Sequence, residues 1–268
     1  MMAMDRRKFL KIAGLSALAG LGGGKAAFEL LAPGEVEASL QGAAPTAGKK
    51  WGMVVDMTKM TDPIMEKSIE ACHRIHNVPN IGNPKEEIKW IWKETFEHSF
   101  PGQEHEYLAD KFKGRNFLLL CNHCTNPPCC RACPTKATWK REDGVVMMDM
   151  HRCIGCRFCM AACPFGARSF NWGDPRRAPK SLNPEFPTNT DFPTRSKGVV
   201  EKCDLCAERL AKGEFPACVE AANKIARGSL VFGDLDAPES DVRRSLRAHF
   251  TLRRKPELGT GPNIYYIV

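Results

Sequence analysis

Short apolar segments separated by turn residues run through most of the chain, and they predict short strands and loops rather than long helices. Residues 137–140 and 145–148 are two such segments on either side of Asp143-Gly144. This dipeptide favours a tight turn between antiparallel strands. We therefore expect a β-hairpin over residues 137–148.

One longer segment has helical periodicity. Asp62-Pro63 is a favourable helix start, because proline fixes the first helical φ angle where no intrahelical N–H bond is needed. The positions behind it that fall on one side are Ile64, Ser68, Ile69, Cys72, Ile75 and His76. A helix that turns this side to a core is expected.

Two other stretches predict less. Residues 77–116 carry Trp90, Trp92 and Phe96 among charged residues, and we expect them to cover the rest of the fold or a partner. Residues 183–197 are rich in Pro, Asn and Thr, which predicts a loop.

The N-terminal segment has the features of an export signal. Residues 5–11 (DRRKFLK) resemble the twin-arginine (Tat) motif, and a weakly apolar run follows over residues 12–21. A membrane-spanning helix needs about 20 apolar residues, so this run is too short for one. We predict a Tat signal peptide over residues 1–38, with cleavage at 38–47, and a periplasmic, peripheral protein at the cytoplasmic membrane. The alternative is a basic amphipathic helix on a soluble chain.

The composition contains one anomaly. The chain has 268 residues, of which 43% are hydrophobic, so it is long enough for a core and is not a disordered chain. It also has 13 cysteines, an odd number that does not fit a closed set of disulfides. Because the Tat system exports proteins already folded around cofactors, a Tat signal on a cysteine-rich chain indicates metal centres.

One cysteine run has ferredoxin spacing. Residues 153–164 (CIGCRFCMAACP) read C-x2-C-x2-C-x3-C-P, the bacterial ferredoxin pattern for a 4Fe-4S cluster. The two-residue gaps let a loop curl around one cluster and present three thiolates, while the fourth cysteine reaches a different cluster. A zinc site is the alternative, but zinc sites usually pair two C-x2-C units across a longer spacer.

A second run, residues 121–134, repeats this design with a longer middle loop. It reads C-x2-C-x4-C-x3-C-P if Cys129 is the third ligand, and Cys130 is then a small buried hydrophobic residue. In a two-cluster ferredoxin, each cluster takes its fourth ligand from the other run. The predicted ligand sets are Cys121, Cys124, Cys129 and Cys163 for cluster A, and Cys153, Cys156, Cys159 and Cys133 for cluster B.

Further cysteines follow in the last third of the chain. Residues 201–206 read EKCDLC, and eleven residues separate the second cysteine of this motif from Cys218. Together with the two runs and residues 51–56 (WGMVVD), they make the chain similar to a known family over residues 51–268. It resembles the four-cluster electron-transfer subunits of the dimethyl-sulfoxide reductase and polysulfide reductase group.

The resemblance implies an α/β (α+β) fold of two nested ferredoxin-like units with long loops, the inner unit inserted into the outer one. Residues 117–197 would form the inner unit with two clusters. Residues 51–116 and 198–268 would form the outer unit, which in this family holds the first and fourth cysteine runs.

The predicted outer unit departs from the family pattern. No cysteine follows Lys59 until Cys72, although the family has four there, and Ala222 and Asn223 replace a final Cys-Pro. In this family each outer cluster takes three ligands from one outer run and its fourth from the other. By this rule one outer cluster has no ligands left. The other, cluster C, keeps Cys203, Cys206, Cys218 and Cys72. We expect three 4Fe-4S clusters, with iron bound through these cysteines. The alternatives for Cys72 are a core position and replacement by His73.

The resemblance also implies a function. No catalytic constellation, haem-attachment motif or nucleotide-binding loop stands out in the sequence, so we expect a non-catalytic electron-transfer subunit. The implied partners are an NrfD-like multi-span quinone-interacting subunit, a multihaem cytochrome c and further subunits of a membrane complex. The length, leader and missing cluster are most similar to those of DsrMKJOP-type complexes, which are linked to sulfite reduction.

Two alternatives stay open. One is a scaffold with only two clusters, and the other is an iron–sulfur subunit of a molybdopterin oxidoreductase, an Hmc- or Qrc-type complex or a hydrogenase. Cleavage after Ala38 would remove five positive and four negative residues and lower the net charge from +8 to +7. Each oxidised cluster with its four thiolates would add a charge of roughly −2. The net positive charge of the sequence therefore balances the charge of its own predicted cofactors and does not indicate a nucleic-acid-binding protein.

Overall fold

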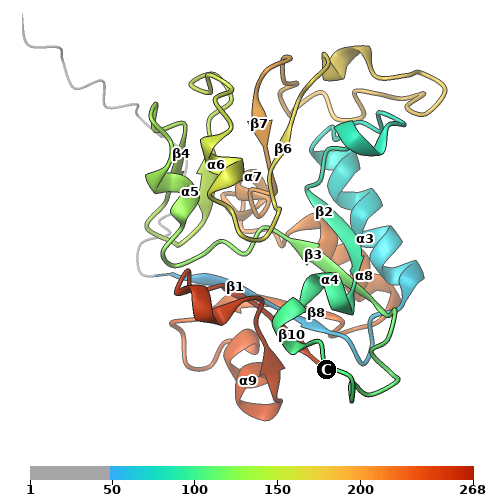
Figure 1. Cartoon of the computed structure of the whole chain (residues 1–268), viewed down its shortest axis with the longest axis vertical. Coiled ribbons are helices and arrows are strands. Elements are labelled where there is room, and N and C mark those ends of the chain that lie inside the picture. The colour runs from blue at the N-terminus through green and yellow to red at the C-terminus, as the bar shows by residue number, and fades with distance from the viewer. Residues whose placement is uncertain (1–48) are drawn as a thin grey trace, which may run out of the picture. The chain divides into compact units, whose positions relative to one another are not determined.

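A four-stranded sheet joins the two ends of the described chain (Figure 1). Strand β1 (Trp51–Asp56) lies between the antiparallel β8 (Leu230–Asp234) and the parallel β10 (Ile264–Ile267), and β9 (Thr251–Leu252) completes the edge. This computed structural model describes residues 49–268, so the predicted signal peptide and its cleavage region lie outside the described residues.

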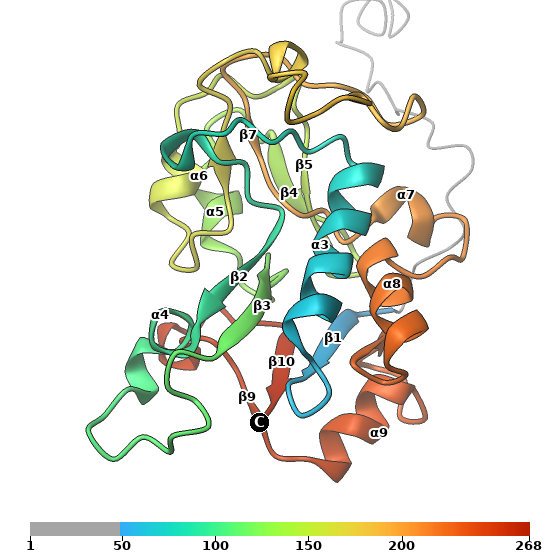
Figure 2. The same cartoon turned by 90° about the vertical axis from the view of Figure 1, so that its right-hand side faces the viewer.

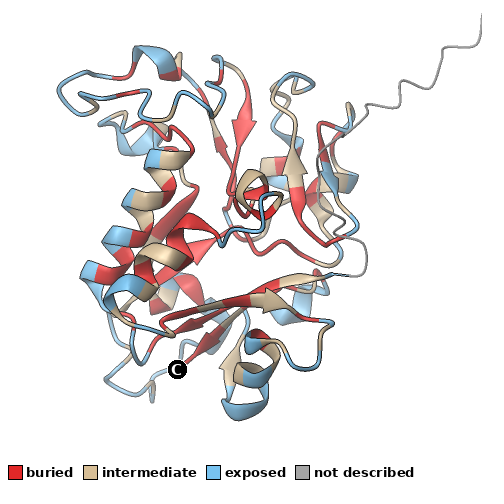
Figure 3. Cartoon of the chain, turned by 180° about the vertical axis from the view of Figure 1, so that it is seen from behind, coloured by how far each residue is buried: buried red, intermediate tan, exposed pale blue. Residues whose placement is uncertain are grey.

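Both faces of strand β1 are covered, which explains its nearly continuous apolar sequence. Met53 and Val55 belong to the main core, whereas Val54 packs on the opposite face with Val242 of helix α9 (Asp241–Ala248). In Figure 3 the strands of this sheet are buried or half-buried, while loop tips and the outer sides of the helices are exposed.

The predicted helix is confirmed as α3 (Asp62–Ile75), which begins with proline in its first turn. It runs side by side with α8 (Ala217–Ile225), as Figure 2 shows, and the two helices pack against each other. Its buried residues are Ile64, Met65, Ser68 and Cys72, so the expected side does face the core. Ile69 and Ile75 are only partly buried, and His76 lies one residue beyond the helix.

The other strands form three short antiparallel pairs. They are β2 (Ile91–Thr95) with β3 (Asn116–Leu120), β4 (Thr138–Lys140) with β5 (Val146–Met148), and β6 (Ser169–Phe170) with β7 (Val200–Glu201). The pair β4–β5 confirms the predicted hairpin, and Gly144 has a φ of +83° in its turn. The remaining α-helices are the short α4 (Phe96–Ser99), α5 (Pro128–Arg131), α6 (Phe158–Ala161) and α7 (Ala207–Leu210).

These small sheets and helices confirm a mixed α+β architecture. Strand pairing crosses both predicted unit boundaries, because β3 pairs with β2 and β6 pairs with β7. The described residues fall within one compact unit, and the nesting of two units stays a prediction. Residues 183–197 form the expected loop without helix or strand, and no helix within residues 49–268 is long and apolar enough to cross a membrane.

A buried ion pair ties the long loop to the core. Arg195 and Glu201 are 2% and 0% exposed, and the Arg195 Nε donates to Glu201 Oε2 at 2.8 Å. The same carboxylate accepts hydrogen bonds from Trp90 Nε1 and Asn171 Nδ2, each at 2.6 Å. Arg195 also donates to the Asn77 carbonyl at 2.7 Å. All charges in this network are therefore paired where water cannot screen them.

Replacing Arg195 with methionine should destabilise the fold by about 3–5 kcal/mol, because Glu201 would keep a buried charge without its partner. The thermal unfolding midpoint should then fall by roughly 6–20 °C, at 2–4 °C per kcal/mol for a chain of this size. The control is Arg176→Met, which breaks an exposed pair with Asp174 and should cost at most about 1 kcal/mol. Equal midpoints for the two variants would contradict the role assigned to the buried pair.

Candidate metal centres

The four cysteines predicted for cluster A line one small cavity together with Arg168. Cys121 directly follows β3, Cys129 lies on α5, and Cys163 follows α6, so three elements bring the sulfurs to one point. Burial raises the pKa of Cys124 to about 12. In contrast, a hydrogen bond from Cys130 and the nearby positive charges lower the pKa of Cys129 to about 5.

The loop of cluster A is held by the end of the chain. His123 adopts a left-handed φ of +41°, and its carbonyl accepts a hydrogen bond of 2.7 Å from Asn263 Nδ2. The backbone N–H of Thr125 donates to the Gly261 carbonyl at 2.8 Å, and that of Asn263 donates to the Asn122 carbonyl at 3.0 Å. The C-terminal segment therefore orients a ligand loop from the middle of the sequence.

The cysteines predicted for cluster B lie on two packed segments. Cys153 and Cys159 are neighbours in one hydrophobic cluster, which also contains Cys129 and Cys130. Cys133 follows α5, which packs against α6, the helix that carries Cys159. Cys153 and Cys156 are only partly buried, so this is the most exposed of the three groups.

A glycine is required inside the cluster B loop. Gly155 has a φ of +70°, and a Cβ there would lie 2.3 Å from the Gly198 carbonyl oxygen. Any side chain would therefore push the loop away from residues 198–200, where the Val200 N–H donates to Cys153 Sγ at 3.5 Å.

The structure brings the four cysteines predicted for cluster C together from helix α3 and from residues 203–218. They are Cys72, Cys203, Cys206 and Cys218, and all are buried. Burial and the charges of the other three cysteines raise the pKa of Cys72 well above its ordinary value. Backbone N–H groups also point at the sulfurs, since Leu205 donates to Cys203 and Ala217 to Cys206, each at 3.4 Å.

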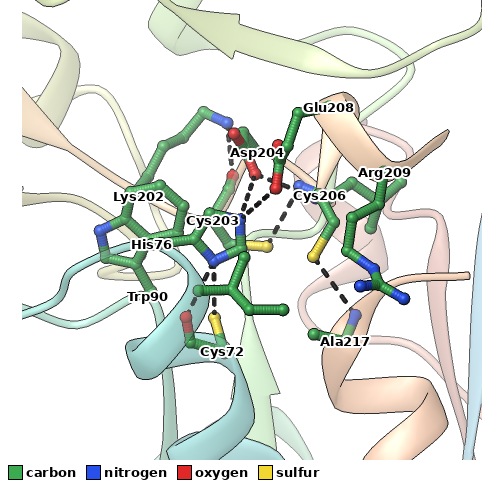
Figure 4. A network of polar contacts seen from close by, with 12 residues as sticks. Cys72, His76, Trp90, Lys202, Cys203, Asp204, Cys206, Glu208, Arg209 and Ala217 are labelled. Atoms are coloured by element: carbon green, nitrogen blue, oxygen red, sulfur yellow. Dashed lines mark hydrogen bonds and ion pairs between the residues drawn. The ribbon is translucent and has the colours of Figure 1, made fainter. Parts of the chain in front are cut away.

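His76 contacts this group, as Figure 4 shows, and sequence reasoning did not assign it a role. Its Nδ1 lies 3.5 Å from Cys72 Sγ, and its Nε2 lies 3.0 Å from Glu208 Oε1 and 3.5 Å from Asp204 Oδ1. Burial lowers the pKa of His76, but the two carboxylates outweigh this effect and raise it. His76, Cys206 and Glu208 lie close enough to share a metal ion, yet they adjoin the cluster C cysteines and belong to the same site.

His73, the proposed substitute ligand, has no such contact with the cysteines. It is partly buried, and burial lowers its pKa to about 4. His73 lies near the end of α3 and His76 one residue beyond it, so the two histidines are neighbours on one surface. Their spacing of three residues does not indicate which of them contacts the cysteines.

Two buried cations lie among the cysteine groups. Arg168 is 5% exposed and Lys202 is 1% exposed, and neither forms an ion pair with a carboxylate anywhere in residues 49–268. Lys202 Nζ donates to the carbonyls of Val146 and Cys203 (Figure 4). Its charge favours the thiolate forms of Cys121 and Cys203, which belong to different cysteine groups.

Apolar packing is found where the family resemblance implied a further cysteine run. Helix α3 is continuous over the segment in which the missing cysteine run was expected. Ile64, Met65 and Ala222 belong to one hydrophobic core, and Ala222 is 0% exposed. The side chain of Asn223 is used structurally, since its Nδ2 donates to the Leu230 carbonyl at 2.8 Å.

The donor sets fit iron–sulfur clusters. All 13 cysteines are free, and the three predicted ligand sets use twelve of them. Burial raises the pKa values of Cys203 and Cys206, like that of Cys72, well above the ordinary value, and a bound cation would favour the thiolate forms that ligate it. Buried thiols at ferredoxin spacing, with backbone donors around them, define an iron–sulfur protein of the ferredoxin type.

Comparisons with known proteins agree. The 4Fe-4S dicluster domain matches residues 115–179. The chain is 36% identical over 287 positions to the Hdr-like menaquinol oxidoreductase iron-sulfur subunit 1 of Archaeoglobus fulgidus, covering 98% of this chain and 97% of the relative. It is 33% identical to the menaquinone reductase iron-sulfur cluster-binding subunit of Nitratidesulfovibrio vulgaris, over 81% of this chain and 88% of the relative.

A third relative is the arsenate respiratory reductase iron-sulfur subunit ArrB of Shewanella sp., with 35% identity over 81% of this chain and 95% of the relative. The chain belongs to the family of iron–sulfur electron-transfer subunits of oxidoreductase complexes. The predicted family resemblance is thereby confirmed, and the family's role in electron transfer is consistent with a non-catalytic subunit.

The ligand role of Cys72 can be tested by substitution. Cys72→Ala should lower the iron content by about four atoms per chain and remove one cluster signal from the EPR spectrum of the reduced protein, because cluster C would lose a buried ligand. Cys130→Ala is the matched control, since Cys130 adjoins a ligand but is not assigned to a cluster. An unchanged iron content in Cys72→Ala would exclude Cys72 as a ligand.

Proposed function

We propose that this protein is a DsrO-type, periplasmic electron-transfer subunit that carries three 4Fe-4S clusters. It relays electrons between an NrfD-like quinone-interacting membrane subunit and redox partners, including a multihaem cytochrome c, in a sulfite-reduction-linked complex of the DsrMKJOP type. The observation that carries the three-cluster proposal is the convergence of Cys72 with Cys203, Cys206 and Cys218.

The full-length relatives support a quinone-linked complex. The relative from A. fulgidus is named as a subunit of a menaquinol oxidoreductase, and the relative from N. vulgaris as a subunit of a menaquinone reductase. Because similarity to the first covers 98% of this chain, the shared features are not limited to the dicluster segment. The missing cysteine run and the leader favour the sulfite-reduction-linked type.

The bound clusters would supply one-electron steps, and the chain supplies their surroundings. All four cysteines of cluster C and three of the four of cluster A are buried, which limits the access of water to both sites, while Arg168 and Lys202 place positive charge beside the sulfurs. Backbone donors such as Leu205 N–H hold the ligand loops rigidly, so little reorganisation accompanies a change in charge.

Electrons would be exchanged with a partner at cluster B. Cys153 and Cys156 are partly exposed, and Ile154 and Phe158 in the same loop are 67% and 60% exposed. Exposed apolar residues beside a redox centre suit a contact surface for another protein. The cysteines of cluster C are all buried, which makes that group a poorer point of contact.

A second candidate is an iron–sulfur subunit that serves a catalytic oxidoreductase directly, such as a molybdopterin enzyme. The 35% identity with ArrB over 95% of that protein, which is named as a subunit of an arsenate respiratory reductase, favours it. Both candidates use the chain as an electron-transfer subunit and differ in the partner that contacts it.

The partners can be identified by purifying the tagged full-length protein anaerobically from its native membranes in mild detergent. The proposal predicts co-purification of a multi-span subunit and a multihaem cytochrome c, with about twelve irons per chain, and reduction of the clusters by a menaquinol analogue. About eight irons would support the two-cluster scaffold. A large molybdopterin subunit in place of the membrane partner would support the second candidate.

The proposed location has its own test. Substituting Arg6→Lys and Arg7→Lys together should keep the protein in the cytoplasm, because the twin arginines form the proposed Tat motif. Fractionation with cytoplasmic and periplasmic marker proteins provides the measurement. Lys8→Arg and Lys11→Arg together are the control, since they exchange the same residue types outside the arginine pair. Normal export of the twin-lysine variant would refute the Tat assignment.

A further inference from the structure

We propose that the buried guanidinium of Arg168 is shared by clusters A and B and raises the reduction potentials of both. This inference rests on the proposed cluster-binding function, and it assigns to one side chain the role of coupling the electrostatics of the two inner clusters. No motif in the sequence indicates this role.

The position of Arg168 is fixed by the hairpin between the two cysteine runs. Its Nη2 donates to Thr138 Oγ1 at 2.8 Å, and its Nη1 lies 3.8 Å from Met148 Sδ. Thr138 is itself held in place, because its hydroxyl donates to the Met147 carbonyl at 2.7 Å. Strands β4 and β5 therefore hold the guanidinium between the segments that carry the ligands.

The guanidinium adjoins cysteines of both groups. Arg168 lines the cavity formed by the four cysteines of cluster A, and its Nη1 lies 3.8 Å from Met148 Sδ, which packs in the same hydrophobic cluster as Cys159 of cluster B. Cys129 and Cys159 belong to the same small hydrophobic cluster, so the two sulfurs flank one buried region.

Sulfur supplies the negative charge that Arg168 requires. A buried cation is costly unless it is paired, and no carboxylate in residues 49–268 forms an ion pair with Arg168. Four of the predicted ligand cysteines line one cavity with Arg168, so their sulfurs supply this charge when a cluster is bound. The guanidinium is thus a buried counter-ion of the two inner cysteine groups.

A fixed positive charge favours the reduced state of an adjacent cluster, because reduction adds one negative charge. Removing this charge should lower the potentials of clusters A and B in parallel. Cluster C should change less, since the buried cation beside its Cys203 is Lys202.

The test is an EPR-monitored redox titration of the anaerobically purified full-length chain carrying Arg168→Met. We expect the iron content to be retained, and the reduction equilibrium of two clusters to shift at least tenfold toward the oxidised state. This corresponds to about 59 mV for a one-electron step. The third cluster should shift by less. Arg168→Lys keeps the charge and should restore most of the difference.

Arg152→Met is the matched control. Arg152 immediately precedes Cys153, but its side chain is 69% exposed and pairs with Asp149, so water and salt screen its charge. Its removal should leave all midpoints nearly unchanged. If Arg152→Met shifts the potentials as much as Arg168→Met, burial of the charge is not the cause and the proposal fails.

Other results would also overturn the proposal. The proposal fails if an Arg168→Met protein that keeps its iron has unchanged midpoint potentials. It also fails if Arg168→Lys lowers the midpoint potentials as much as Arg168→Met does. If Arg168→Met does not assemble clusters, Arg168→Gln provides the decision, because it removes the charge but keeps side-chain N–H donors. Lowered midpoints of two clusters in Arg168→Gln support the proposal, and unshifted ones refute it. The iron content of the unmodified protein separately tests the three-cluster function.

Discussion

Burial of negatively charged sulfur is the constraint on which the rest of this structure depends. The predicted ligand sets use twelve cysteines, and most of these are buried in an environment where an isolated thiolate is strongly disfavoured. The chain meets this cost with Arg168, Lys202 and backbone N–H groups rather than with a purely apolar core. The short strands and loops serve mainly to place these donors and cations around the sulfurs.

The packing of α3 against α8 illustrates the same constraint from the opposite side, because no cysteine follows Lys59 until Cys72. Without the cysteines there is no buried negative charge to balance, and a continuous helix with an apolar side can fill the volume. Ile64 and Met65 of α3 and Ala222 of α8 do so. A partial ligand set would have left buried thiols without metal, so replacement of the whole group by aliphatic packing is the less costly arrangement.

Local patterns in the sequence predicted the elements that local forces determine: the hairpin around Gly144, helix α3 and the spacing of the cysteine runs. Contacts between distant residues were not predictable in this way. Asn263 supports the loop of His123, which lies 140 positions away in the chain, and Arg168 lies beside the cysteines of the cluster A cavity. The pair β6–β7 was also missed, because two-residue strands have no periodicity to detect.

The support of a central loop by the last residues has a consequence for how the protein is made. Strand β1 is synthesised first, yet it is flanked by β8 and β10, and the loop of cluster A is held by Gly261 and Asn263. Neither can be completed until residues 261–267 have left the ribosome. Stable enclosure of the cofactors therefore follows the synthesis of this segment, and a cofactor that is inserted earlier meets an unsupported cluster A loop.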